Sequence, residues 1–205
     1  MTPGTVLKEI AAVGALLASY PLDRVARNAP EIVFAARDEP VILIHGYGGG
    51  RSNLLALASY LRLAGMDNIS YFEYPRRQTI TESALRLSAM VTEVAGPTGG
   101  AHLVGHSLGG TIARLYTMTA RRGAVRSLVT LGSPYLFGHW AQRELAIFGD
   151  EDPIVPAPTG ILAESMPFGR RVVLAGAGHL VLPFLPEALR MVATELRANR
   201  VAAAA

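Results

Sequence analysis

The pentapeptide Gly105-His106-Ser107-Leu108-Gly109 is the segment whose residue types and spacing point most directly to chemistry. An apolar run, residues 101–104, precedes it, and a run with helical spacing, residues 111–122, follows it. A G-x-S-x-G sequence between a strand and a helix places its serine at the tip of a sharp turn, because glycines on both sides let the chain pass close to itself. So sharp a turn forces the serine into a strained backbone conformation with positive φ, which holds the Ser107 hydroxyl out of the turn. The backbone N–H group of Leu108, at the start of the helix, points to the same space. The pattern therefore predicts that Ser107 is a nucleophile.

A serine hydroxyl reacts only when a base removes its proton, and a histidine base needs a carboxylate that fixes its tautomer. His179 follows the last expected strand and is the predicted base. Asp152 lies in an acidic turn after the expected strand 145–148 and is the predicted acid. Asp150 and Glu151 are adjacent to it and stay open as alternatives.

Strands that alternate with amphipathic helices must position these residues. The expected strands cover residues 31–36 (an edge strand), 41–44, 69–74, 101–104, 125–131, 145–148 and 171–175. The expected helices cover residues 10–20, 54–61, 80–94, 111–122 and 183–199. This alternation predicts an α/β fold with a mostly parallel sheet of about six strands and helices on both faces. Functional side chains gather at the carboxyl ends of such strands. The length fits a single domain over residues 1–205, with an N-terminal helix and linker (1–30) and a catalytic core (41–199).

The N-terminal segment is amphipathic. Val6, Ile10, Val13 and Leu17 recur at helical spacing, and the apolar run 10–20 is too short to span a bilayer. We expect this apolar side to pack on the domain; contact with a membrane surface is the alternative. The segment lacks a clear signal-peptide pattern, which favours a cytoplasmic or peripherally membrane-associated protein.

The composition excludes several classes of function. The formal net charge of +3 is small and spread along the chain, so no basic patch for nucleic acid is expected. The chain has no cysteine, which rules out disulfides, thiolate catalysis and zinc–cysteine sites. The sequence shows no glycine-rich phosphate loop, dinucleotide fingerprint or metal-ligand cluster. We therefore expect no cofactor and no metal.

Five segments together resemble the α/β-hydrolase superfamily, and within it the small bacterial lipases and esterases without a large lid domain. They are 41–50 (VILIHGYGGG), 104–110 (VGHSLGG), 129–134 (VTLGSP), 152–156 (DPIVP) and 176–182 (GAGHLVL). The order Ser107, Asp152, His179 is also the order of nucleophile, acid and base on this fold. The resemblance extends from Val41 to the last helix and does not cover the residues before Pro40.

The resemblance implies a serine hydrolase that cleaves carboxylic esters of small molecules or lipids through an acyl-enzyme. It further implies that the backbone N–H groups of Tyr47 and Leu108 form an oxyanion hole, which stabilises charge in the transition state. The same residues would also suit a thioesterase or acyltransferase, and a non-catalytic relative that binds an apolar ligand is a further alternative.

The substrate pocket is less well defined by the sequence. The side chains of Tyr135, Phe137 and Trp140 could line an acyl pocket or belong to the core, and the two interpretations are equally favoured. Leu180, directly after the predicted base, is a further candidate for this pocket. The short region between Ser133 and Asp152 leaves no room for a large lid. Of the other histidines, His45 is expected to hold its loop and His106 to pack beneath the turn.

Overall fold

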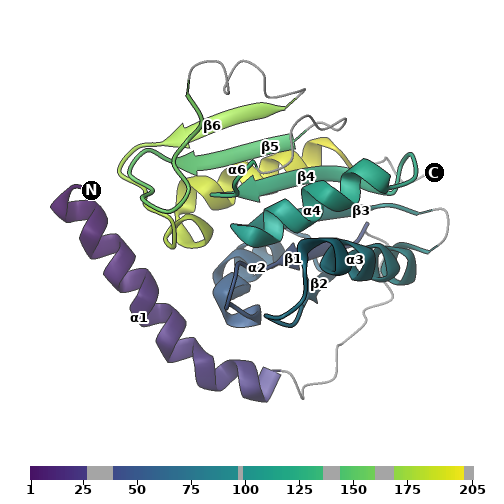
Figure 1. The fold of residues 1–205 in the computed structure, drawn as a ribbon, viewed down its shortest axis with the longest axis horizontal. Coiled ribbons are helices and arrows are strands. Elements are labelled where there is room, and N and C mark those ends of the chain that lie inside the picture. Colours follow the sequence, from purple (N-terminus) through teal and green to yellow (C-terminus); the bar gives the residue numbers. More distant parts are fainter. Residues whose placement is uncertain (27–38, 97–98, 136–143, 160–168, 201–205) are drawn as a thin grey trace.

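A computed structural model describes residues 1–26, 39–96, 99–135, 144–159 and 169–200, with the side chains of α1 described over residues 1–15. Its centre is a parallel sheet in the order β2-β1-β3-β4-β5-β6 (Figure 1). The strands are β1 (Val41–Ile44), β2 (Ile69–Phe72), β3 (Ala101–His106), β4 (Val125–Leu131), β5 (Glu144–Gly149) and β6 (Arg170–Leu174). The helices are α1 (Pro3–Ala26), α2 (Leu55–Leu63), α3 (Ile80–Ala95), α4 (Leu108–Thr119) and α6 (Pro186–Ala198), with short 3₁₀ turns η1 (Arg51–Leu54) and η2 (Leu182–Phe184).

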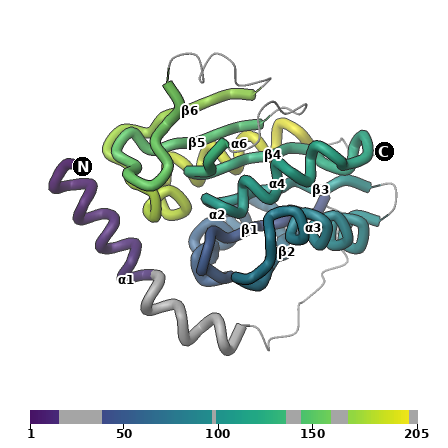
Figure 2. Tube along the Cα trace, viewed as in Figure 1, coloured from purple at the N-terminus to yellow at the C-terminus, as the bar shows by residue number. Residues whose placement is uncertain are grey.

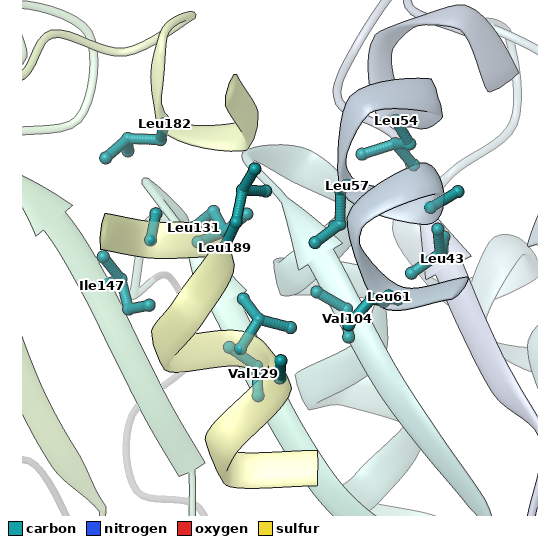
Figure 3. Close-up of a cluster of buried hydrophobic side chains, with 14 of the residues drawn as sticks. Leu43, Leu54, Leu57, Leu61, Val104, Val129, Leu131, Ile147, Leu182 and Leu189 are labelled. Carbon is teal, nitrogen blue, oxygen red and sulfur yellow. The ribbon is translucent and has the colours of Figure 1, made fainter. Parts of the chain in front are cut away.

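Helices cover both faces of the sheet, and the strands supply apolar side chains to both. On one face, α2 and α6 pack against alternate strand residues such as Leu43, Val104 and Val129 (Figure 3). On the other face, α3 and α4 pack against residues such as Ile42 and Leu103. Because both faces of the sheet are covered, β1, β3, β4 and β5 are buried at nearly every position, as in other parallel sheets.

The six strands predicted from apolar runs after Pro40 are confirmed, and so is the α/β fold with helices on both faces. The order of the strands places β3, which ends at the predicted nucleophile, between β1 and β4. The expected edge strand at residues 31–36 lies outside the residues that the structure describes.

The N-terminal helix lies outside the two helical layers, with its first residues beside the loops that follow β5 and β6 (Figure 2). The predicted orientation of this helix is wrong. Val6, Ile10 and Val13 are 40%, 60% and 39% exposed. The side that meets the domain instead carries Thr5 and Ala12, both buried, together with Glu9. The side chain of Leu17 lies outside the described part of α1.

The orientation of α1 has a physical cause in its docking surface. The loop after β6 presents backbone polar groups toward the helix, and Lys8 and Glu9 bond to them. Backbone N–H groups that leave water need an acceptor, so the polar side of the helix meets the loop and the apolar side faces outward.

Candidate active site

The turn between β3 and α4 holds Ser107 in a strained conformation. Its backbone angles are φ 53° and ψ −123°, and it is the one non-glycine residue with positive φ among those that the structure describes. The turn is fixed by hydrogen bonds from Ser107 N to the carbonyl of Leu131 and from Gly110 N to the carbonyl of Ser107. Strain of this kind costs about 1–3 kcal/mol and is found mostly at functional sites.

The two outer glycines of the pentapeptide are required by close backbone contacts. A Cβ atom at Gly105 would lie 2.4 Å from the backbone nitrogen of Gly110, and one at Gly109 would lie 2.4 Å from the carbonyl oxygen of Ile44. Any side chain at either position would therefore force the turn open. This geometry explains the spacing that marked Ser107 in the sequence.

Three residues from the ends of different strands form a continuous chain of hydrogen bonds. The Nε2 atom of His179 lies 2.9 Å from Oγ of Ser107, and its Nδ1 atom lies 2.7 Å from Oδ2 of Asp152. His179 and Asp152 are both buried. The other carboxylate oxygen, Oδ1, accepts the N–H groups of Ile154 and Val155 at 2.8 Å each. Asp152 thus holds the proton of the imidazole on Nδ1 and leaves Nε2 free to accept one.

The two alternative acids bond elsewhere. Asp150 accepts the backbone N–H of Ala177, and Glu151 accepts that of Thr2. The structure therefore brings Asp152, and neither neighbour, to the imidazole of His179. The assignment of catalytic roles to these residues stays a proposal, which is argued below.

Gly132, at the end of β4, makes room for the acid–base pair. It has φ +53°, and a Cβ atom there would lie 3.2 Å from both Oδ2 of Asp152 and Nδ1 of His179 and 2.9 Å from the side chain of Leu182. A larger residue would push the two apart. The sequence segment VTLGSP contains this glycine, but only the structure shows that the space beside it is occupied by the side chains of Asp152 and His179.

The loop after β1 lies directly beside the serine. A Cβ atom at Gly46 would be 3.0 Å from Cβ of Ser107. The loop is held by Tyr74, whose hydroxyl donates to the carbonyl of His45 at 2.8 Å and whose ring stacks on that of His45. Burial raises the pKa of Tyr74, so the hydroxyl stays protonated and keeps donating. Tyr47 follows in this loop and Leu108 is the first residue of α4, so both predicted oxyanion donors belong to segments that contact Ser107.

His106 packs beneath the turn, as expected. Its Nε2–H group donates to the backbone carbonyl of His179 at 3.1 Å, and the two rings lie 5.0 Å apart. Burial lowers the pKa of His106 to about 4, and the nearby imidazole of His179 adds to the shift. His106 is therefore uncharged at neutral pH. Its role is to hold the backbone of His179 by a hydrogen bond, and not to transfer protons to or from a substrate.

The buried neutral His106 predicts how stability depends on pH. In the unfolded chain a histidine has a pKa near 6.5, so between that value and about 4 the unfolded state binds a proton that the folded state does not. Stability is therefore complete above pH 6.5 and falls by about 3 kcal/mol as the pH is lowered to about 4. Urea unfolding across this range tests the slope. The control is His106→Gln, whose amide takes up no proton; an equally steep fall in that variant would contradict the assignment.

Of the predicted pocket residues, the structure describes Tyr135 and Leu180, and none of the contacts observed for either one reaches Ser107. The guanidinium carbon of Arg114 lies 3.6 Å from the centre of the Tyr135 ring. Tyr135 is half-buried, and its ring lies near that of Phe148. Leu180 packs against the core between α6 and the sheet. Phe137 and Trp140 lie outside the described residues. The acyl pocket therefore stays a prediction.

A polar cavity of about 290 Å³ lies beyond the ends of β1 and β2. It is lined by His45, Gly49, Gly50, Glu73, Tyr74, Pro75 and Arg86. In the described parts of the chain, no group of three or more His, Asp and Glu side chains could hold a metal ion.

A buried ion pair that no sequence pattern predicts lies beside the site. Arg114, on α4, is completely buried; its Nε atom lies 3.0 Å from both carboxylate oxygens of Glu144, and its Nη2 atom lies 2.7 Å from one of them. The remaining guanidinium nitrogen donates to the carbonyls of Ser133 and Pro134, just past β4. No sequence signal separates this arginine from the exposed ones on other helices.

Comparison with known proteins agrees with this architecture. Residues 95–150, which include the serine turn, match a family model described as alpha/beta hydrolase fold. No curated protein matches. A bacterial membrane phospholipase A has a TM-score of 0.65 at 15% identity, over 80% of each chain. Esterase PE8 has a TM-score of 0.61 at 19% identity, over 80% of this chain and 94% of that one. Est1E from Butyrivibrio proteoclasticus has a TM-score of 0.59 at 15% identity, over 80% and 87%. On these findings the chain has the α/β-hydrolase fold.

Proposed function

We propose that the protein is a serine hydrolase that cleaves carboxylic esters through an acyl-enzyme. The observation that carries the proposal is the hydrogen-bonded chain from Asp152 through His179 to Ser107, with the serine held in a strained turn. Nucleophile, base and orienting acid within hydrogen-bond distance of one another are the signature of covalent catalysis by serine.

In the proposed mechanism, Oγ of Ser107 attacks the ester carbonyl carbon while Nε2 of His179 takes the hydroxyl proton. The tetrahedral oxyanion accepts the N–H groups of Tyr47 and Leu108, and Asp152 stabilises the imidazolium. The C–O bond to the alcohol then breaks, and the leaving oxygen takes the proton from His179. A water molecule, deprotonated by His179, then attacks the acyl carbon. The bond from that carbon to Oγ of Ser107 breaks, Oγ takes the proton back from His179, and the carboxylic acid is released.

The choice of esters is supported by the similar structures, which include a phospholipase and two esterases. The short connection between β4 and β5 also supports an open site, since Ser133 and Asp152 bracket too little chain for a large lid.

A p-nitrophenyl ester series combined with a fluorescent phosphonate tests the proposed function. The phosphonate traps activated serines, so one label per folded molecule should map to Ser107, and esters should compete with it. The chain length that competes best reports the acyl pocket. If correctly folded protein takes no label and cleaves no ester, the proposal fails and a ligand-binding role becomes the better interpretation.

We further propose that the outward side of α1 contacts a lipid surface. Seven of the eleven exposed large apolar side chains in the described residues lie on α1, directly before it, or on the loops that follow β1 and β5: Met1, Val6, Leu7, Ile10, Val13, Tyr47 and Ile154. Apolar side chains concentrated beside a site suggest a surface that is covered in use. Over the described parts of the chain, no helix is long and apolar enough to cross a membrane, so the proposed contact is interfacial.

Leu7→Ser should weaken binding to phosphatidylcholine vesicles about tenfold, because a leucine transferred from water to an apolar phase contributes roughly 1.5–3 kcal/mol. The matched control is Leu85→Ser on α3, since Leu7 and Leu85 are both 69% exposed. Co-sedimentation with vesicles measures both variants. Equal binding by the two would contradict a lipid-facing role for α1.

A further inference from the structure

The carboxylate of Glu9 bonds to the backbone directly after His179. Its Oε2 atom accepts the N–H of Leu180 and its Oε1 atom accepts the N–H of Val181, each at 2.9 Å. The contact is tight, because a Cβ atom at Gly178 would lie 2.7 Å from the Glu9 side chain. One side chain of α1 thus satisfies two consecutive donors in the loop that carries the base.

The remaining contacts of α1 place Glu9 firmly on this loop. Nζ of Lys8 donates to the carbonyl of Gly176 at 2.8 Å, and the backbone N–H of Thr2 donates to Glu151, the neighbour of Asp152. Thr5 and Ala12 are buried against the domain on the same side of the helix. The N-terminal half of α1 therefore touches the loop of the base and the loop of the acid.

The backbone of His179 is held on its other side by the serine turn. His106 donates a hydrogen bond to the carbonyl of His179, while the Glu9 carboxylate accepts hydrogen bonds from the next two backbone N–H groups along the chain. With the peptide groups around His179 fixed from both sides, the imidazole has little freedom to move relative to Ser107 and Asp152. The distances of 2.9 Å and 2.7 Å on its two ring nitrogens depend on that placement.

We propose that Glu9 is a positioning residue for the base of the site, acting through the backbone of residues 180 and 181. The inference rests on the proposed function, because it concerns the same base. A carboxylate suits the role since its two oxygens match two N–H donors and its charge strengthens both bonds. An amide offers a single acceptor oxygen and directs its own N–H groups at the second donor.

Glu9→Ala should lower kcat for a water-soluble p-nitrophenyl ester by roughly 10- to 100-fold with little change in KM, since a shift of about 1 Å at a catalytic group can cost that much. Glu9→Gln should fall between wild type and Glu9→Ala. The rate constant for labelling by the phosphonate should drop by the same factors, while the final label still reaches one per molecule. A variant that merely lost folded protein would show less final label at an unchanged rate.

Lys8→Met is the matched control. It removes a contact between the same helix and the same loop, but at a residue three positions before the base, and should stay within about twofold of wild type in kcat. If Glu9→Ala does not fold, Glu9→Gln carries the test, since it keeps the length of the side chain.

The outcomes separate the two proposals. Wild type that is labelled at Ser107, with Glu9→Ala and Glu9→Gln unchanged in kcat and labelling rate, overturns the role of Glu9 alone. Lys8→Met that is as slow as Glu9→Ala also overturns it, because helix docking in general would then explain the effect. Folded wild type that takes no label overturns the proposed function and this inference with it.

Discussion

Ser107→Ala should lower kcat for ester hydrolysis by about 10⁶-fold, the loss seen when the nucleophile of a comparable site is removed. The hydroxyl makes the only covalent bond to the acyl group in the proposed mechanism, so no neighbouring group replaces it. The fold should be unaffected, because the strained backbone at residue 107 is held by the turn and not by the side chain. Steady-state kinetics with p-nitrophenyl acetate and a thermal unfolding curve measure the two effects.

Ser107→Gly provides the control for strain. Glycine adopts φ 53° without a steric penalty, so this variant should be as inactive as Ser107→Ala and about 1 kcal/mol more stable than it. Activity above about one per cent of wild type in either variant would show that the reaction has another nucleophile.

Arg114→Met should lower the free energy of unfolding by about 3–5 kcal/mol, because it leaves the Glu144 carboxylate buried without its partner. The cost includes the lost bonds to the carbonyls of Ser133 and Pro134. Urea unfolding at neutral pH measures the change. Arg114→Met combined with Glu144→Leu should recover most of the stability, since replacing both members of a buried pair is often nearly neutral.

Arg190→Met is the control for the arginine substitution, as Arg190 is exposed on α6 and should change stability by no more than about 0.5 kcal/mol. A single Arg114 variant as stable as this control would show that the buried pair contributes nothing to the folded state. A double variant no better than Arg114→Met would instead assign the loss to the carbonyl contacts past β4.

The sequence predicted what depends on local pattern. Strands such as Val41–Ile44 are short apolar runs, and the serine turn is marked by glycines whose missing side chains the backbone requires. The three candidate site residues follow strands, and parallel strands bring their carboxyl ends to one edge of the sheet. For these features the chemistry of a few neighbouring residues determines the structure.

The sequence did not predict what depends on partners far along the chain. Val6, Ile10 and Val13 have the spacing of a buried helix face, yet that face is exposed because Glu9 bonds to the loop after His179. Glu144 precedes the expected strand 145–148, but in the structure it begins β5 and pairs with Arg114. The spacing of apolar residues predicts which side of a helix is apolar. It does not show that backbone N–H groups elsewhere in the fold, here those of Leu180 and Val181, need an acceptor from the polar side.

The contact between α1 and the loop after β6 also bears on how the protein is made. It joins residues that are 171 and 172 positions apart, so it forms only after Val181 has left the ribosome. The partners of the β3–α4 turn, in contrast, reach no further along the chain than Leu131, so this turn can form earlier. During translation α1 is therefore made before the loop on which it docks, and the acid and base of the site are made after the serine. A chain interrupted between Ser107 and His179 would contain the serine and lack the base that is proposed to activate it.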